Sequence, residues 1–417
     1  MAIARRGAIG HDRRIMPDER ELERIAPPPW MSEDATLAVL AALGPGAARF
    51  VGGPVRDSIL GRPVLDIDIA TTHRPEAAMK RLRDAGIAVV PTGLKHGTVT
   101  AVMPPRRFEI TSLRRDVETF GRHARVEFCD DWVEDARRRD FTMNALFLDA
   151  EGRIFDSVGG LADLRSGRVR FVGDAERRIR EDVLRLLRFY RFHAHYGRGA
   201  ADAEARAAAR ALAHSLPRLS AERVRAELLK LLAAPDPVPT LALMREDGVL
   251  PFVLPEARGF ETLAALVALE DEADPVRRLG ALAAADSVAD RLKLKNADRA
   301  RLAAFAARGE LLPATDARSL RRALYRLGTP LFRDLVLLAG AATGDPATAR
   351  AGLRLAAEWR APRFPLKGRD LAQRGVTPGP ELGRLLKEIE SWWEAGDFAA
   401  DRAACLAEFE RRISRAS

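Results

Sequence analysis

The stretch Val64–Thr71, "VLDIDIAT", places two aspartates two residues apart among apolar and β-branched neighbours. On a β-strand, side chains at positions i and i+2 point to the same face. Asp66 and Asp68 are therefore predicted to stand together, while Leu65 and its apolar neighbours face the other side. Because two adjacent carboxylates repel each other, the pair requires an explanation. Three are common: a solvated sheet face, an acid/base pair and a divalent cation site.

A glycine turn precedes the aspartates, in the segment Phe50–Gly61, "FVGGPVRDSILG". Gly52 and Gly53 allow backbone N–H groups to approach a phosphate, and a helix predicted to begin near Val55 would add the positive end of its dipole. Arg56 is placed to bind the same group. A plain strand-to-helix turn is the alternative. The combination favours a cation site, because Mg²⁺ is held by carboxylates together with substrate phosphates.

A third carboxylate is expected on a neighbouring strand, because sites that hold two metal ions recruit one. Glu109 in "RFEIT" has the required setting, an acidic residue between apolar ones. An edge-strand glutamate without a metal role is the alternative for this residue.

Composition limits the class of protein. The chain has 417 residues, which suggests two to three domains at about 150 residues each. Its 68 Lys and Arg residues exceed its 59 Asp and Glu residues, and a net charge of +9 favours an anionic partner such as nucleic acid. Only Cys129 and Cys405 are present, which excludes a disulfide framework and fits a reducing cytoplasm. No apolar run reaches the roughly 18 residues of a membrane span.

The hydrophobic pattern divides the chain into two kinds of structure. Short β-branched runs broken by turn residues predict an α+β domain with a small mixed, mainly antiparallel sheet up to about residue 155. After about residue 173, apolar residues at three and four spacings predict helices only. We expect a disordered lead-in over residues 1–32, an α+β domain over 33–155, and helical domains over 156–235 and 236–417.

Five motifs follow one another in a recognisable order. They are "FVGGPVRDSILGRPVLDIDIATT", "RRRDFTMNALFLD", "DSVGGLADL", "REDVLRLLRFYRF" and "SAERVRAELLKLL". In this the sequence resembles the bacterial class II CCA-adding tRNA nucleotidyltransferase and poly(A) polymerase family, strongly over residues 50–232. The resemblance implies a polymerase-beta-like nucleotidyltransferase head, a helical neck that reads the nucleotide base, and a helical body and tail that hold the acceptor arm and 3′ end of tRNA.

The resemblance also assigns roles to individual residues. It implies that Asp66 and Asp68 bind metal, while Glu109 is the further catalytic carboxylate that its strand setting suggests. The nucleotide-binding positions that the resemblance implies are Gly53, Arg56, Arg139, Asp140, Asn144, Asp182 and Arg185. The residue pattern adds three more: Gly52 in the glycine turn, and Arg188 and Arg191 further along the predicted helix. Arg139 and Asp140 match a motif associated with ribose recognition. A structural salt bridge between these two residues is the alternative.

The segment "EDVLRLLRFYR" is predicted to form one helix, with Asp182, Arg185, Arg188 and Arg191 along a single stripe. A solvated face in which Glu181 pairs with Arg185 is the alternative. In the family, the matching Asp and first Arg read the base. Cytosine and adenine each present an amino donor beside a ring-nitrogen acceptor, which suits a carboxylate that accepts and a guanidinium that donates. Uracil and guanine present the inverted pattern.

The activity implied by the resemblance is addition of CCA to the 3′ end of tRNA without a nucleic-acid template. The substrates would be CTP and ATP, the cofactor two Mg²⁺ ions, and the by-product pyrophosphate. A poly(A) polymerase and partial enzymes that add only CC or only A stay open, because the segment "RRDVETFGRHARVEF" departs from the family's pattern. A non-catalytic RNA-binding protein is the alternative from another class.

Overall fold

The computed structural model describes residues 20–120, 123–312 and 314–416, and their contacts divide the chain into two compact units. The first unit contains the chain up to residue 220 together with residues 243–252, and the second contains residues 221–242 and 253–417. These units do not follow the boundaries predicted at residues 155 and 235, which stay predictions about function.

The predicted disordered lead-in is wrong for residues 20–32, and its residues 1–19 lie outside the described part of the chain. Strand β1 (Arg20–Arg24) pairs with β10, and Pro29–Ser32 forms a short 3-10 helix. The ring of Trp30 packs edge-on against Phe50 with 4.7 Å between centroids, and its N–H donates to Ser58 over 3.1 Å. Burial of the Trp30 ring against Phe50 stabilises the ordered conformation of this segment.

An eight-stranded sheet in the first unit has the order β1-β10-β9-β2-β3-β6-β5-β4. All neighbouring pairs are antiparallel except β3 and β6, which are parallel, so the predicted mixed sheet is confirmed. Its remaining strands are β2 (Ala48–Val51), β3 (Ile67–Thr71), β4 (Ala88–Gly93), β5 (Thr98–Met103), β6 (Arg106–Ser112), β9 (Phe147–Leu148) and β10 (Arg153–Asp156). Strands β7 (Arg114–Phe120) and β8 (His123–Phe128) pair separately, and residues 121 and 122 between them lie outside the described residues.

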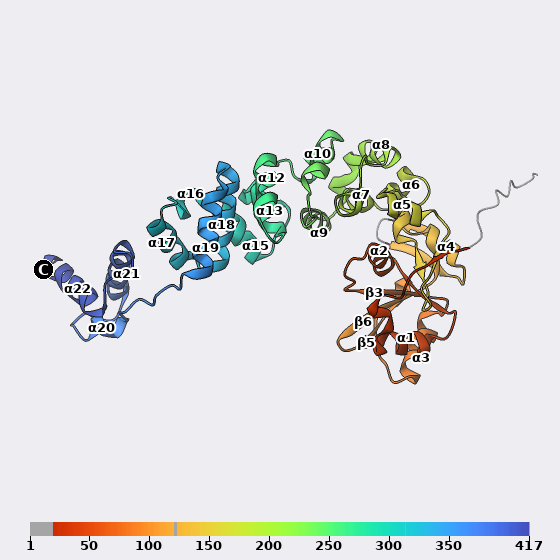
Figure 1. The fold of residues 1–417 in the computed structure, drawn as a ribbon, viewed down its shortest axis with the longest axis horizontal. Coiled ribbons are helices and arrows are strands. Elements are labelled where there is room, and N and C mark those ends of the chain that lie inside the picture. Colours follow the sequence, from red (N-terminus) through yellow and green to blue (C-terminus); the bar gives the residue numbers. More distant parts are fainter. Residues whose placement is uncertain (1–19, 121–122, 313, 417) are drawn as a thin grey trace, which may run out of the picture. The chain divides into compact units, whose positions relative to one another are not determined.

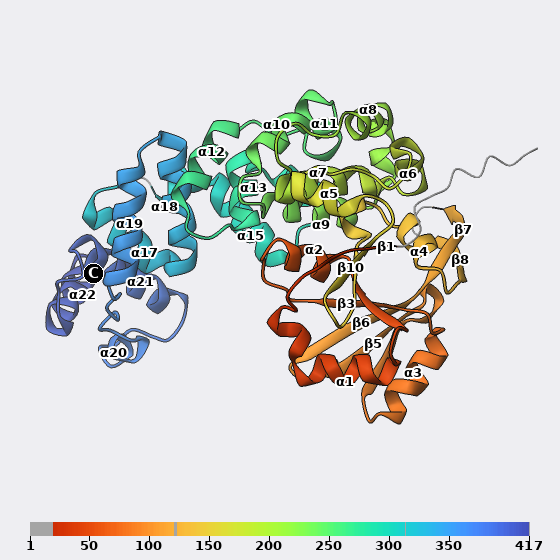
Figure 2. The same ribbon diagram turned by 45° about the vertical axis from the view of Figure 1, so that its right-hand side comes forward.

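Burial alternates along the central strands and decides which face is left for the site. Ile67 and Ile69 of β3 are buried, as are Phe108 and Ile110 of β6. Helices α1 (Asp34–Leu43) and α3 (Pro75–Asp84) lie side by side beneath the sheet, and α2 (Gly53–Ile59) lies on its other side, against β2 and β3 (Figure 1, Figure 2). The polar residues of β3 and β6 that alternate with the buried ones are therefore left uncovered by α1 and α3.

Short helices complete the first unit. They are η2 (Leu94–His96), α4 (Trp132–Arg137), η3 (Thr142–Asn144), α5 (Gly160–Ser166), α6 (Ala175–Glu181), α7 (Leu184–Tyr196), α8 (Ala203–Leu212) and η4 (Ala213–Arg218). The prediction of one continuous helix through "EDVLRLLRFYR" is wrong at its start. Asp182 is extended, with φ −150° and ψ 109°, and separates α6 from α7. Its Oδ1 accepts from the N–H of Leu184 over 3.1 Å, a local bond that competes with helix continuation.

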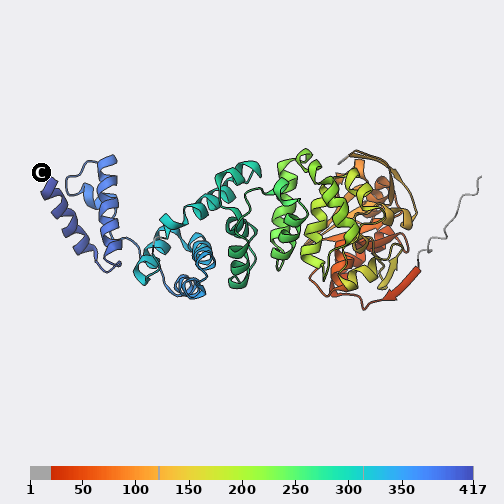
Figure 3. The same cartoon turned by 90° about the horizontal axis from the view of Figure 1, so that it is seen from above.

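The second unit is helical throughout its described residues, as the sequence predicts (Figure 3). Its helices are α9 (Ala221–Leu232), α12 (Phe260–Leu269), α13 (Pro275–Ala283), α14 (Asp286–Arg291), α15 (Asn296–Ala306), α16 (Arg308–Leu311), α17 (Ala317–Leu327), α18 (Thr329–Thr343), α19 (Pro346–Glu358), α20 (Gly368–Ala372), α21 (Pro380–Ala395) and α22 (Arg402–Ala416). Helices α10 (Val238–Glu246) and α11 (Leu250–Val253) contribute to both units. In the described part of the chain, no helix has the length and apolar character needed to cross a membrane.

Candidate active site

The parallel pairing of β3 and β6 brings two of the predicted catalytic carboxylates together. Asp68 and Glu109 are directly opposite each other in the register. Asp66 lies one residue before the start of β3 and is exposed, as is Glu109. The strand begins later than predicted, which explains why Leu65 is 82% exposed and does not face the apolar side. The three carboxylates therefore gather at an uncovered, polar surface of the sheet.

These carboxylates are not neutralised by the protein itself. Among the residues that the structure describes, no hydrogen bond or ion pair engages the carboxylate of Asp66, Asp68 or Glu109. The pKa of Asp68 is raised to about 6, first by burial and then by the charges of Glu109 and Asp66. The charges of Arg139 and Arg56 lower this pKa only in part. The negative charge around Asp68 is therefore not fully offset by the protein.

A divalent cation fits this donor set. Within the described residues, no group of three or more His, Cys, Asp or Glu side chains is arranged to hold a metal ion. Mg²⁺ does not need such a cage, because it is usually bound through one or two carboxylates together with water and substrate phosphates. Asp66 and Asp68 supply oxygen ligands of the preferred kind, and a cation there would offset the repulsion that raises the pKa of Asp68.

The glycine turn borders the carboxylates as predicted from its place in the sequence. Gly52 has φ +75°, a conformation that favours glycine. A Cβ atom added at Gly52 would lie 3.9 Å from Asp68 Oδ2 and 3.9 Å from Arg139 Nη1. At Gly53, an added Cβ would lie 3.8 Å from the guanidinium of Arg56. The two glycines therefore keep open the space between an acidic group and two basic ones, where a polyphosphate could approach.

A hydrogen-bonded chain connects Arg56 to α7 through Asn144. Arg56 Nη1 donates to Asn144 Oδ1 over 2.7 Å, and Asn144 Nδ2 donates to Asp140 Oδ1 over 3.1 Å. Arg188 Nε donates to Asp140 Oδ2 over 2.7 Å. The guanidinium of Arg56 also lies 4.1 Å from the centre of the Tyr196 ring. Four predicted nucleotide-binding residues from three distant segments are thus joined in one network.

The pKa of Asp140 is shifted in the opposite direction from the pKa of Asp68. Burial alone would raise its pKa, but the charge of Arg188 and hydrogen bonds from Asn144, Arg188 and the backbone N–H of Phe141 outweigh burial. The resulting pKa is about 2. This carboxylate is therefore ionised at neutral pH and fully engaged with the protein.

The alternative reading of Arg139 and Asp140 as a salt-bridged pair is wrong. Arg139 pairs with Asp135 over 2.8 Å, while Asp140 pairs with Arg188. Asp135 has no exposed surface and also accepts from Arg138 Nε over 2.7 Å. Asp135 was not predicted from the sequence, although its spacing of three and four residues to Arg138 and Arg139, which follow α4, was a usable signal.

The predicted base-reading residues lie where α6 gives way to α7. The Glu181–Arg185 pair named in the alternative reading is present, with Arg185 Nη1 2.5 Å from Glu181 Oε2, but both side chains are largely buried and do not form a solvated face. Arg185 Nη1 also donates to the carbonyl of Arg178 over 3.0 Å. Asp182 lies between the two helices. The guanidinium of Arg191 lies 4.4 Å from the centre of the Phe192 ring, at the following position of α7. Arg178, which is buried and contacts both Arg185 and Glu181, was not predicted as a site residue from the sequence.

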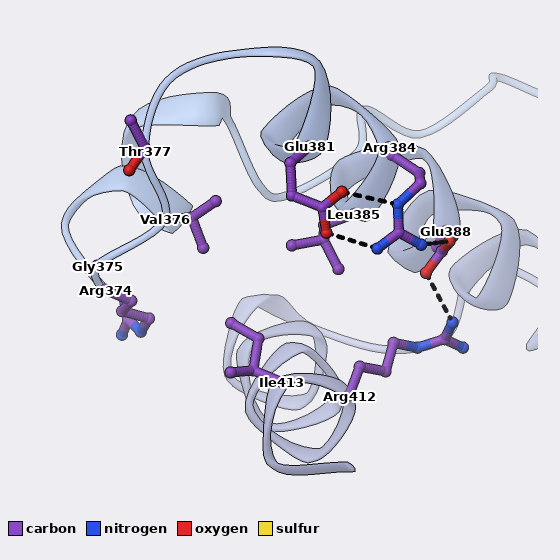
Figure 4. Close-up of a pocket in the computed structure, with 10 residues that line it drawn as sticks. All are labelled: Arg374, Gly375, Val376, Thr377, Glu381, Arg384, Leu385, Glu388, Arg412 and Ile413. Atoms are coloured by element: carbon purple, nitrogen blue, oxygen red, sulfur yellow. Dashed lines mark hydrogen bonds and ion pairs between the residues drawn. The ribbon is translucent and has the colours of Figure 1, made fainter. Parts of the chain in front are cut away.

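A pocket of about 700 Å³ in the second unit does not include any of these residues. It is lined by the loop of residues 374–377 that follows α20 and by α21 and α22, as Figure 4 shows. There Arg384 lies between Glu381, at 2.5 Å, and Glu388, which also faces Arg412 at 3.6 Å (Figure 4). Because its arginines are matched by glutamates, the pocket does not offer the uncompensated charge found around Asp68.

Comparisons with known proteins agree with this geometry. Residues 48–170 match the poly A polymerase head domain, and residues 201–260 match a domain described as a probable RNA and SrmB-binding site of polymerase A. The CCA tRNA nucleotidyltransferase 1 of Mus musculus is 35% identical over 388 residues, covering 86% of this chain and 85% of that protein. The CCA-adding enzyme of Geobacillus stearothermophilus is 40% identical over 223 residues, covering 53% of this chain and 54% of that protein.

A solved structure extends the likeness to the whole fold. The Bacillus stearothermophilus CCA-adding enzyme in complex with CTP superposes with a TM-score of 0.76 at 30% identity, over 91% of this chain and 97% of that one. Fold and site together define a nucleotidyltransferase. The chain belongs to the CCA-adding tRNA nucleotidyltransferase and poly(A) polymerase family.

Proposed function

We propose that this enzyme adds CCA to the 3′ end of tRNA from CTP and ATP without a nucleic-acid template. The observation that carries the proposal is the meeting of Asp68 and Glu109 on paired strands beside the space that Gly52 keeps open. The relatives named for CCA addition support the choice of reaction within the family. In the reaction, the RNA 3′-hydroxyl attacks the α-phosphate of the nucleotide and pyrophosphate leaves.

The carboxylates Asp66 and Asp68 would hold Mg²⁺. Two such ions would supply the positive charge that favours ionisation of the attacking hydroxyl and offsets charge on the departing pyrophosphate. Arg139 and Arg56 favour the ionised form of Asp68 but do not outweigh burial and the neighbouring carboxylates, so a bound cation would complete its ionisation. Glu109 adds a third negative group at the same surface. Gly52 and Gly53 leave room for the triphosphate, and Arg56 is held beside it by Asn144.

Base selection would be performed by Asp182 and Arg185. Asp182 Oδ1 is engaged by the N–H of Leu184, which orients the carboxylate, and a carboxylate can accept from an amino group of C or A. Arg185 uses Nη1 for Glu181 and the Arg178 carbonyl, and its other N–H groups can donate to the ring nitrogen. Arg139, Asp140 and Asn144 would bind the ribose side of the nucleotide.

We expect the helical part of the chain to hold tRNA through phosphate contacts, in keeping with the net charge of +9. The neck over residues 156–235 and the body and tail over 236–417 stay proposals for this division of labour. Cys129 and Cys405 are free thiols, as suits a reducing cytoplasm. The mouse relative is named mitochondrial, so a cytoplasmic location stays a prediction.

One assay separates the candidate activities. Three tRNAs, ending at the discriminator base, at C and at CC, are each incubated with Mg²⁺ and labelled CTP or ATP. Addition of C, C and A in order is the expected result. Addition of only CC or only A, or of an adenosine tail to any RNA end, would assign the enzyme to another member of the family. Absence of all incorporation, with tRNA binding retained, would indicate an RNA-binding protein.

A further inference from the structure

Arg178, in the last turn of α6, joins two parts of the candidate site that are about 40 residues apart in sequence. Its Nη2 donates to the main-chain carbonyl of Arg139 over 2.6 Å and also to that of Arg138. Its Nη1 donates to the carboxylate of Glu181. Arg178 is only 7% exposed, so these bonds form away from bulk water and are correspondingly sensitive to geometry.

The same residue closes a ring around the base-reading arginine. Arg185 binds the Glu181 carboxylate, which Arg178 also binds, and Arg185 donates to the Arg178 carbonyl over 3.0 Å. Side chain and main chain of Arg178 thus both determine where the Arg185 guanidinium lies. Because the side chain is anchored to the backbone that carries Arg139, the position of the base reader is set relative to the residues assigned to the ribose.

We propose that Arg178 is a positioning residue for base selection: it holds Arg185 and Asp182 at a fixed place relative to the Arg139–Asp140 segment. The inference rests on the proposed function, since it names a determinant of the same nucleotide site. Losing the guanidinium would remove one of the arginines that hold Glu181, leaving its pairs with Arg185 and Arg177, and would release the α6 end from the Arg138 and Arg139 carbonyls. A nucleotide held by its ribose and phosphates would then meet a displaced base reader.

The chain offers a matched control for the general cost of removing such an arginine. Arg278, in α13 of the second unit, is 2% exposed and donates to two main-chain carbonyls, those of Leu232 and Ala234, and to the Glu270 carboxylate. It therefore makes the same set of bonds as Arg178 but contacts none of the predicted nucleotide-binding residues. A purely structural effect should be shared by substitutions at both positions.

Chemical rescue can test the role of the guanidinium directly. Arg178 and Glu181 line a cavity of about 750 Å³ in the first unit, so a small cation can reach the space that Arg178→Ala vacates. The other carboxylates that line this cavity, Asp156 and Asp174, accept from backbone N–H groups, and Arg170 binds Asp163 over 2.8 Å. Added guanidinium at millimolar concentration is therefore expected to occupy the vacated position between Glu181 and the carbonyls.

The experiment measures kcat/KM for CTP and UTP on tRNA lacking CCA, with the full-length wild type, Arg178→Ala, Arg178→Lys and Arg278→Ala. Arg178→Ala should narrow the CTP:UTP ratio about tenfold or more, because small displacements of a positioned group have large effects. Guanidinium should widen the ratio again, and Arg178→Lys should fall between. Arg278→Ala should lower the melting temperature while leaving the ratio at the wild-type value.

Two results would overturn the inference. One is a uniform loss of rate in both Arg178 variants with the CTP:UTP ratio unchanged. The other is an equal narrowing of the ratio in Arg278→Ala. If Arg178→Ala does not fold, Arg178→Lys and its binding constants for CTP and UTP, from equilibrium dialysis, give the same comparison. A wild-type enzyme without preference for CTP would instead refute the proposed function, and the inference with it.

Discussion

Asp68 and Asp140 belong to the same site and differ in almost every electrostatic respect. Asp68 shares its surface with two other carboxylates and has a pKa raised to about 6 by burial and by their charges. Asp140 is surrounded by donors, with Arg188 at 2.7 Å and Asn144 at 3.1 Å, and has a pKa lowered to about 2 despite burial. Arg188 of the protein balances the charge of the Asp140 carboxylate. The charge of the Asp68 carboxylate is balanced only in part, and a bound cation would balance the rest.

The opposite pKa shifts of Asp68 and Asp140 suit two different tasks in a nucleotidyltransferase site. The carboxylates around Asp68 have their charge offset only in part, so on the proposed function a divalent cation and its bound phosphates would be stabilised there. The network of Asp140, Asn144 and Arg188 is already hydrogen-bonded within the protein, so on the same proposal it would present a fixed shape to the ribose and base. Gly52 lies beside both parts: a Cβ atom added there would lie 3.9 Å from Asp68 Oδ2 and 4.0 Å from the carbonyl oxygen of Asn144.

The largest effect on activity is expected from removing one of the two carboxylates assigned to the metal, Asp66 or Asp68. Asp66→Ala and Asp68→Ala should each abolish nucleotide addition, a loss of at least about a thousandfold, because the metal would lose one of its two carboxylate ligands. Binding of tRNA should stay within a few-fold, since these residues are assigned to metal and not to RNA. Single-turnover rates and filter binding measure the two quantities.

Asp84→Ala is the matched control for these variants, because Asp84 is an exposed aspartate paired only with Lys80 on α3. It should keep wild-type turnover. Near wild-type activity of either active-site variant in Mg²⁺ would refute the metal assignment.

A second prediction concerns the hydrogen-bonded network of Asp140, Asn144 and Arg188. Asp140→Asn should lower the free energy of unfolding of the first unit by about 2 kcal/mol at pH 7, which corresponds to the gap between the ordinary pKa of 3.8 and about 2. A lowered pKa contributes stability that is present above pH 3.8 and is lost as the pH falls through 2. The difference between wild type and variant should therefore be constant from pH 7 to pH 5, as measured by hydrogen exchange of amides in η3 and α7. A difference that fades within that range would mean that Asp140 titrates there.

The smallest of these effects concerns the choice of base by Asp182 and Arg185. Asp182→Ala removes the acceptor for the amino group of C or A, while Arg185 remains able to donate to a carbonyl of U or G. The CTP:UTP and ATP:GTP ratios should each narrow by at least about tenfold. Arg185→Ala should lower the use of CTP and ATP together. Initial rates with all four triphosphates provide the measurement, and equal slowing of every reaction would identify the segment as a scaffold.

Much of the fold was predictable because its signals are local. Alternating apolar residues predicted the strands around Asp68 and Glu109, and helical periodicity predicted the second unit. The order of strands was not predictable from these patterns, since the parallel pairing of β3 and β6 joins segments far apart in sequence. The ordering of residues 20–32 was missed because it depends on Trp30 finding Phe50 in the folded structure.

The sequence predicted a set of site residues, which stays a prediction, but it did not predict the contacts among them. Arg139 and Asp140 are neighbours in sequence, which suggested a pair, yet their side chains bind Asp135 and Arg188. The helix break at Asp182 was missed because the periodicity of its arginines continues through it, while the bond from Asp182 to the Leu184 N–H is a feature of three residues only. Arg178 was not predicted because its bonds to the Arg138 and Arg139 carbonyls leave no mark in the sequence, although its spacing of three residues to Glu181 was a usable signal.

The contrast between the two aspartates can be measured directly by carbon NMR titration of the aspartate carboxyl groups, assigned with Asp68→Asn and Asp140→Asn. Asp68 should titrate near pH 6 in the free enzyme and at lower pH once Mg²⁺ and CTP are added, because a cation favours the ionised carboxylate. Asp140 should show no titration above pH 4 in either state. A midpoint for Asp68 near the ordinary 3.8, or one that Mg²⁺ and CTP leave unchanged, would contradict the account.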